Sequence, residues 1–110
     1  MITFIAHVRV KPENVPAYEA LMTHVRDSSR ANEPGIVYYD FGKSAEEPEV
    51  YCVIEVYRDA AAHAAHMETS WVRDSIPESR RLVDGGFNIR QYVSPGTAPA
   101  VRRMQEREDD

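Results

Sequence analysis

The sequence predicts an α+β fold in which an antiparallel four-stranded sheet carries its helices on one face. Residues 2–10 and 50–57 are apolar segments suited to strands, and residues 15–31 and 60–69 are suited to helices. With further strands at 36–41 and 87–93, the order of elements is β-α-β-β-α-β. This order predicts the ferredoxin-like arrangement, whose two helices pack on the same side of the sheet.

The first strand and helix follow from the opening residues. In MITFIAHVRV one side of the strand carries Ile2, Phe4, Ala6, Val8 and Val10, and the other carries Thr3, Ile5, His7 and Arg9. KPENVP ends this alternation, because its prolines suit only the start of a helix, and Asn14 can serve as the N-cap. Apolar residues then recur at helical spacing until Pro34 and Gly35 end the helix.

Two β-branched and aromatic segments come next. IVYYDF at 36–41 and VYCVIEVY at 50–57 predict strands, and the turn-rich GKSAEEPE at 42–49 connects them. FNIRQYV at 87–93 predicts the last strand of the sheet.

The region between these strands is predicted to hold two helical segments. Asp59 caps an Ala-rich helix at about 60–69. Ser75 and Glu78 have the spacing of a capping box with Pro77 in the first turn, which predicts a separate short helix. We therefore place one domain over residues 1–93, and residues 94–110 form a C-terminal tail that is mobile unless a partner holds it.

Composition narrows the class of protein. The 110 residues suit one domain, and 43% hydrophobic with 28% charged residues is typical of globular proteins. A net charge of -5 argues against nucleic acid as a partner. Cys52 is the single cysteine, so no internal disulfide forms, and the N-terminus resembles neither a signal peptide nor a membrane span. These observations predict a cytoplasmic protein that does not contact membranes.

The apolar faces of the strands predict a homodimer. The even-numbered residues of the first and third strands are all apolar, whereas helices can cover only one face of a sheet. An uncovered apolar face is larger than a monomer normally exposes, so we expect a second copy to cover the even-numbered face. The odd-numbered face then lies beneath the helices, with His7 and Glu55 either in a ligand pocket or in a buried hydrogen-bond network.

Three stretches resemble a known family. EPGIVYY (33–39), VYCVIEVYRDAAAHAAH (50–66) and TSW (69–71) are similar to the antibiotic biosynthesis monooxygenase (ABM) domain family, over about residues 2–93. That family includes cofactor-independent quinol and polyketide monooxygenases, haem-degrading relatives and a phospho-autoinducer isomerase. The resemblance implies a dimeric α+β barrel with a pocket between the sheet and the helices of each subunit.

The resemblance also suggests roles for individual residues. His66 matches a histidine that these proteins commonly have on the second helix, and Trp71 stands where quinol-type members have a second histidine. His7 occupies a first-strand position where haem-degrading relatives have a pocket asparagine. Their haem-ligating histidine is missing, since that neighbourhood reads Asp74, Ser75 and Ile76 here.

The histidines and the cysteine have simpler interpretations beside the functional ones. His63 is expected on the solvated side of its helix, and His66 either at the pocket edge or as a hydrogen-bonded boundary residue. The pair His63 and His66 supplies too few ligands for zinc, and Cys52 lies on the dimer-facing side, so we expect no metal site. Cys52 is not expected to act as a nucleophile in an apolar row.

Glu55 and the aromatic residues have two interpretations each. Glu55 either pairs with Arg9 or Arg90, or raises the basicity of a nearby histidine. The aromatic candidates are core residues or walls that hold a planar substrate: Tyr39, Tyr51, Tyr57 and Trp71.

The function that we expect is cofactor-independent oxidation of a quinol-like or polycyclic aromatic molecule by O₂. His66 or His7 would act as the base, with Glu55 as the third catalytic residue. No G-x-G-x-x-G motif is present, which argues against a dinucleotide cofactor. Two alternatives stay open: a phospho-sugar isomerase that uses Arg9, Arg73 and Arg90, and a non-catalytic dimer that binds a small molecule or protein.

Overall fold

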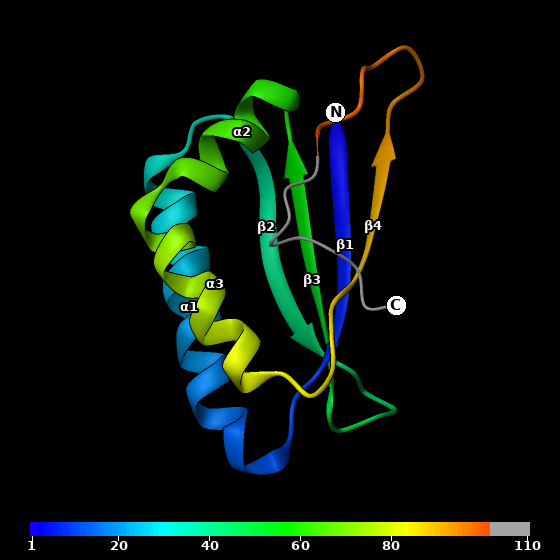
Figure 1. The fold of residues 1–110 in the computed structure, drawn as a ribbon. Helices are drawn as coiled ribbons and strands as arrows, with labels where there is room; N and C mark the ends of the chain where they lie inside the picture. The colour runs from blue at the N-terminus through cyan, green and yellow to red at the C-terminus, as the bar shows by residue number, and fades with distance from the viewer. Residues whose placement is uncertain (102–110) are drawn as a thin grey trace.

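The computed structural model describes residues 1–101, which form one sheet and three helices (Figure 1). The strands are β1 (Ile2–Arg9), β2 (Ile36–Lys43), β3 (Val50–Tyr57) and β4 (Asn88–Val93). The helices are α1 (Val15–Asn32), which follows a 3-10 turn at Pro12–Asn14, α2 (Ala60–Glu68) and α3 (Ser70–Leu82). None of these helices is both long and apolar enough to span a membrane.

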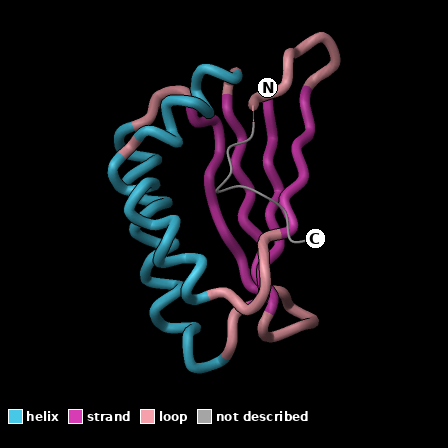
Figure 2. Tube along the Cα trace, viewed as in Figure 1, coloured by secondary structure: helices cyan, strands magenta, loops and turns pink. Residues whose placement is uncertain are grey.

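The sheet has the strand order β2-β3-β1-β4, and all of its neighbouring strands are antiparallel. The three helices lie together on one face, and the other face carries no element of residues 1–101 (Figure 2). The predicted α+β, ferredoxin-like fold is therefore confirmed.

The helical region after β3 differs from the prediction in one respect. α3 begins at Ser70 and not at Ser75, because the Thr69 hydroxyl accepts a hydrogen bond from the Val72 amide and caps the helix there. Ser75 lies within the helix, where its hydroxyl donates to the Val72 carbonyl at 2.7 Å. The predicted capping box at Ser75 is therefore wrong, and Pro77 lies inside a longer helix.

The register between β1 and β3 decides which side chains share a face. Phe4 lies opposite Glu55 and Ala6 lies opposite Val53, so even-numbered residues of β1 pair with odd-numbered residues of β3. Directly opposite residues in an antiparallel pair project to the same side. The helix-covered face therefore carries the even residues of β1 and the odd residues of β3. The predicted grouping of the even residues of both strands on one face is wrong.

The opposite, outer face is partly apolar. It carries Ile5 and His7 from β1 and Cys52 and Ile54 from β3, since each of these lies opposite a residue of the same set. Ile54 is 36% exposed, and Tyr92 of β4 on the same face is 57% exposed. The side of the sheet that the helices leave open is therefore this outer face, which carries odd residues of β1 and even residues of β3. The prediction that the even residues of both strands lie on the open side is wrong.

Residues 94–101 turn back after β4. Gly96 has a φ of 86°, in the left-handed region that glycine adopts readily. The Gln91 side chain then bonds both backbone groups of Ala100, at 2.7 Å to its amide and 3.1 Å to its carbonyl, and Ala100 is buried. The first part of the predicted mobile tail thus packs on the domain. The remainder, residues 102–110, lies outside the described residues.

Candidate active site beneath the helices

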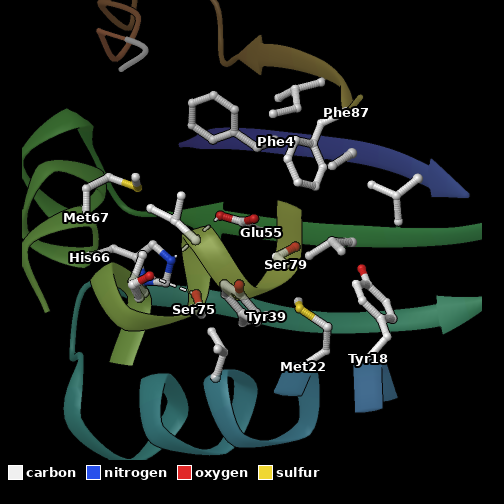
Figure 3. Close-up of a pocket in the computed structure, with 17 residues that line it drawn as sticks. Phe4, Tyr18, Met22, Tyr39, Glu55, His66, Met67, Ser75, Ser79 and Phe87 are labelled. Carbon is white, nitrogen blue, oxygen red and sulfur yellow. Dashed lines mark hydrogen bonds and ion pairs between the residues drawn. The ribbon is translucent and has the colours of Figure 1, made fainter. Parts of the chain in front are cut away.

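A cavity of about 120 Å³ lies between the helix-covered face of the sheet and the helices α1 and α3 (Figure 3). Most of its wall is apolar or aromatic, and among residues 1–101 the only carboxylate and the only imidazole in the lining are those of Glu55 and His66. The lining residues are Phe4, Ala6, Val8, Tyr18, Met22, Val25, Tyr39, Val53, Glu55, His66, Met67, Val72, Ser75, Ile76, Ser79, Phe87 and Ile89.

Small side chains leave the space that forms the cavity. Ala6 sits in the middle of β1, where neighbouring core positions carry Phe4 and Val8. Ser75 and Ser79 face the sheet from α3, one helical turn apart, and fill less volume than the leucine or isoleucine usual at such positions. The sequence therefore leaves a gap in the core beside the two ionisable residues.

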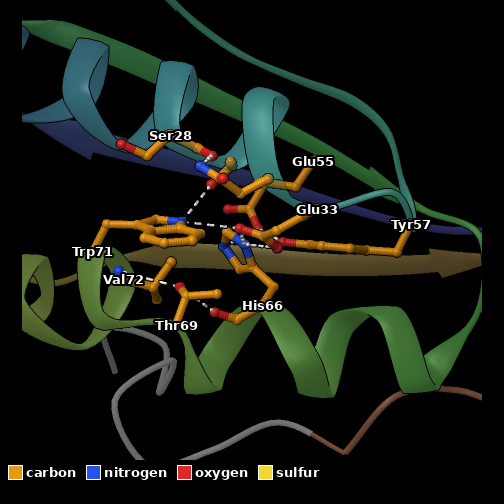
Figure 4. Close-up of polar contacts among 10 residues, drawn as sticks. Ser28, Glu33, Glu55, Tyr57, His66, Thr69, Trp71 and Val72 are labelled. Carbon is orange, nitrogen blue, oxygen red and sulfur yellow. Dashed lines mark hydrogen bonds and ion pairs between the residues drawn. The ribbon is translucent and has the colours of Figure 1, made fainter.

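His66 is held between two carboxylates (Figure 4). Its Nδ1 lies 2.9 Å from Oε1 and 3.2 Å from Oε2 of Glu33, and its Nε2 lies 3.9 Å from Oε1 of Glu55. The side chain of His66 is 3% exposed. Both ring nitrogens thus have a defined environment: Nε2 is on the side of Glu55, which lines the cavity, and Nδ1 is on the side of Glu33, which does not.

Glu33 follows the last residue of α1, and its carboxylate lies beside His66 of α2 and Trp71 of α3. Besides His66, its carboxylate accepts a hydrogen bond from Trp71 Nε1 at 2.9 Å, and Trp71 Nε1 is also 3.2 Å from Ser29 Oγ. Burial by itself raises the pKa of Glu33, but the hydrogen bonds and charge of His66, with the hydrogen bonds of Trp71 and Ser29, lower the pKa overall. Glu33 is therefore ionised, and it can only accept hydrogen bonds.

The tyrosines near Glu55 remain protonated phenols. The Tyr57 hydroxyl donates to Glu55 Oε1 at 2.5 Å. Burial first, and then the charge of Glu55, raise the pKa of Tyr57 and of Tyr39 well above the ordinary value. These side chains can donate hydrogen bonds but do not supply a phenolate at neutral pH.

The structure brings some of the predicted site residues together. Glu55, His66 and Tyr39 line the cavity. Tyr57 does not line the cavity, but it donates a hydrogen bond to Glu55, which does. Trp71 does not line it either, and it donates to Glu33, which is bonded to His66. Two rings pack around His66: the Tyr39 and Tyr57 centroids each lie 5.3 Å from its own.

Two predicted site residues lie elsewhere. His7 is exposed on the outer face of the sheet, where it lies opposite Cys52, so its placement in the pocket is wrong. The register of β1 against β3 is the reason, because an odd residue of β1 shares no face with Glu55. Tyr51 is buried under α1, where its hydroxyl donates to Glu19, and it does not line the cavity.

His63 also differs from the prediction, since it is buried and not solvated. Its ring stacks on Phe4 at a centroid distance of 4.6 Å and meets the edge of Tyr57 at 5.1 Å. His63 and His66 are three residues apart on α2, so they share the helix face that packs on the sheet. Most other residues of α2 are alanines, so the sequence does not show which face of this helix packs on the sheet.

The sequence does not identify Glu33 as a site residue, although the Glu-Pro-Gly stretch that contains it carries part of the family resemblance. A glutamate at the end of a helix carries no sequence signal of a contact with a histidine 33 residues further on. Within residues 1–101, no lysine or arginine lines the cavity, and no three potential ligands among His, Cys, Asp and Glu gather as a metal site. Arg9 and Arg90 project from the outer face, away from the side that carries Glu55.

Comparisons with known proteins agree with this architecture. A Synechocystis protein of unassigned function, sll1783, is 28% identical over 91 residues, which cover 83% of this chain and 61% of that protein, so the chain spans less than two thirds of this relative. A Bacillus subtilis protein named "Putative monooxygenase YcnE" is 26% identical over 89 residues, 81% of this chain and 93% of its own length.

Solved structures and a family model extend the comparison. A Caulobacter crescentus structure described as "a putative antibiotic biosynthesis monooxygenase" superposes with a TM-score of 0.80 at 25% identity, covering 84% of this chain and 88% of its own. The family model "Antibiotic biosynthesis monooxygenase" matches residues 1–81 of the 110. The chain therefore belongs to the antibiotic biosynthesis monooxygenase family.

Proposed function

We propose that this protein is a cofactor-independent monooxygenase that oxidises a small phenol or quinol with O₂, using His66 as the base. The observation that carries the proposal is that His66 lines a largely apolar cavity, with Nε2 on the side of Glu55, while its Nδ1 is bound to the Glu33 carboxylate. Proton abstraction needs a base that a neighbouring group holds in place and that borders a space large enough for the substrate.

The reaction balances without an added reductant. His66 Nε2 takes the phenolic proton, and the resulting phenolate transfers one electron to O₂. Recombination of the two radicals forms a carbon–oxygen bond at a ring carbon that carries hydrogen. Loss of water from that peroxide leaves a quinone, so one oxygen atom stays on the ring and the other leaves as water. His66 returns the phenolic proton to the terminal oxygen of that peroxide and then takes the hydrogen of the ring carbon as a proton, which breaks the O–O bond and releases hydroxide. The hydroxide takes this second proton from His66 and leaves as water.

The cavity supports this chemistry by excluding water. Aromatic and aliphatic side chains make up most of the lining, including Phe4, Phe87 and Met22. A dry environment protects the phenolate and the radical pair from competing protonation. Tyr39 lines the same space and can place a phenol hydroxyl against the substrate oxygen.

Cavity size and charge indicate the substrate class. A volume of about 120 Å³ is close to the ~150 Å³ of an apolar protein cavity that holds benzene, which favours a one-ring phenol over a polycyclic one. Glu55 makes the site acidic, and within the described chain its lining lacks lysine and arginine. These features disfavour the phospho-sugar isomerase, which needs cationic groups for its phosphate.

Oxygen consumption with a panel of one-ring hydroquinones and phenols, anthrone and a phosphorylated sugar tests the proposal. With ¹⁸O₂, the product quinone should gain one labelled oxygen by mass spectrometry. His66→Ala should lower kcat by ~10²-fold or more, whereas His24→Ala, which changes an exposed histidine of α1, should not. Absence of O₂ uptake with every phenol and quinol would contradict the function.

We propose in addition that two copies pack through their outer sheet faces. Tyr38, Ile54 and Tyr92 leave apolar surface exposed on the outer face, and the helices do not cover this side. A second copy is the partner that always accompanies the chain, and a two-fold axis would bring the same patch of each copy together.

A further inference from the structure

We propose that Glu33 is a positioning residue that, held in turn by Trp71, fixes the hydrogen of neutral His66 on Nδ1 and so keeps Nε2 as the acceptor facing the cavity. The consequence for turnover rests on the proposed function, whereas the position of the hydrogen does not. Neither residue has to touch the substrate for this role.

The first step is the acceptor-only character of Glu33. Its Oε1 lies 2.9 Å from His66 Nδ1, and an ionised carboxylate cannot donate. Nδ1 must therefore carry the hydrogen. In neutral imidazole the other nitrogen then lacks one, so Nε2 offers a lone pair.

The second step is the anchoring of the carboxylate. The Trp71 indole N–H, which can only donate, lies 2.9 Å from Glu33 Oε2. His66 Nδ1 is nearer to Oε1, at 2.9 Å, than to Oε2, at 3.2 Å. Glu33 comes from the end of α1, His66 from α2 and Trp71 from the first turn of α3. The side chain of Glu33 is 10% exposed, so water competes little for these bonds.

Trp71 thereby acquires a different role from that of a wall for the substrate. Its indole N–H points to the Glu33 carboxylate (Figure 4), and Trp71 does not line the cavity. A phenylalanine at this position would fill similar space but would leave Oε2 without the indole donor. Trp71→Phe therefore removes the hydrogen bond to Glu33 while it keeps most of the packing of the ring.

Glu33→Gln makes the arrangement testable, because an amide has one acceptor oxygen and one donor nitrogen. Trp71 can only donate, and residue 33 offers a nearer acceptor, at 2.9 Å, than Ser29 Oγ at 3.2 Å, so we expect the amide oxygen to face Trp71 and the NH₂ to face His66. Nδ1 then has to accept, and the hydrogen of neutral His66 moves to Nε2. In Glu33→Gln/Trp71→Phe the indole donor is gone, the amide can turn its oxygen to His66, and Nδ1–H should return.

Long-range ¹H–¹⁵N correlation NMR of the full chain, at a pH where His66 is neutral, reports which nitrogen carries the hydrogen. We expect Nδ1–H in the wild type, in Trp71→Phe and in the double variant, and Nε2–H in Glu33→Gln. Glu68→Gln, an exposed change two residues from His66, is the matched control and should keep Nδ1–H. With a phenol substrate, Glu33→Gln should lower kcat by ~10²-fold or more, and the double variant should recover part of it.

Wild-type His66 with its hydrogen on Nε2 would overturn the inference without any variant, as would Nδ1–H in Glu33→Gln. Nε2–H persisting in the double variant would remove Trp71 from the mechanism. If the tautomers follow the expectation but the wild type oxidises no phenol or quinol, the proposed function fails and the positioning of His66 by Glu33 stands.

Discussion

Gly35 and Ala62 pack so closely that a Cβ on Gly35 would lie 2.5 Å from the Cβ of Ala62. Gly35 follows Glu33 by two residues, and Ala62 precedes His66 by one helical turn. This contact between the turn after α1 and the helix α2 therefore sets how near the Glu33 carboxylate comes to the imidazole. The glycine is required by space and not by its backbone angles, since its φ is not positive.

Gly35→Ala should lower the free energy of unfolding by about 1–3 kcal/mol, because neither backbone nor Ala62 can move away cheaply. Ala62→Gly costs about 1 kcal/mol by itself through helix propensity, but should restore most of the loss when combined with Gly35→Ala. Urea denaturation of the single and double variants measures the coupling.

Gly42→Ala is the matched control for that cycle, since nothing lies within 4 Å of the Cβ it would add. Its effect should stay within about 0.5 kcal/mol. If Gly35→Ala were equally neutral, the contact with Ala62 would not fix the position of α2.

Ala6→Val should reduce substrate binding while the fold stays intact. The added methyl groups enter the cavity beside Glu55 and His66, and valine suits a strand. We expect KM to rise by ~10-fold or more, with stability changed by less than about 1.5 kcal/mol. Steady-state O₂ uptake and thermal unfolding measure the two effects. Thr3→Val, on the outer face of the same strand, should leave KM unchanged.

Acid should remove the stability that ionised Glu33 supplies. Its pKa is lower in the folded than in the unfolded state, so this contribution is complete above the ordinary glutamate value of ~4.3 and is lost as pH falls through the folded pKa. His66 faces the carboxylate directly, and the charge of Glu33 also acts on Tyr39 and Tyr57.

The difference in unfolding free energy between the wild type and Glu33→Gln should accordingly be larger at pH 7 than at pH 3. Urea denaturation at both pH values measures it, with Glu68→Gln as the exposed control. If the difference in unfolding free energy is the same at both pH values, ionisation of Glu33 does not stabilise the fold.

Ile54→Lys should dissociate the proposed dimer. It places a charge in the middle of the outer face, where a sheet-to-sheet interface would bury it without a partner. Light scattering over a range of concentrations should show a dimer for the wild type and a monomer for the variant. Ala61→Lys adds the same charge to an exposed position of α2 and should remain dimeric. A wild type that is monomeric throughout would contradict the proposal.

The sequence by itself determined the type and order of the elements. The alternation in residues 2–10, the helical spacing after Val15 and the breakers at Pro34 and Gly35 are local signals, and the strands and α1 formed where they indicated. The capping-box spacing predicted a helix start at Ser75, and this prediction is wrong. The structure uses Thr69, and the apolar positions of α3 that pack on the sheet extend from Val72 to Leu82.

Only the tertiary structure decided which side chains meet. Alternation divides each strand into two faces, but it does not say which face of β1 matches which face of β3, because that depends on register. This separated His7 from Glu55, and the orientation of α2 buried His63. The contact of Glu33 with His66 joins residues that are far apart in the chain, and it forms because α1 and α2 both pack against α3. Local sequence sets periodicity, whereas contacts between distant residues depend on how whole elements pack.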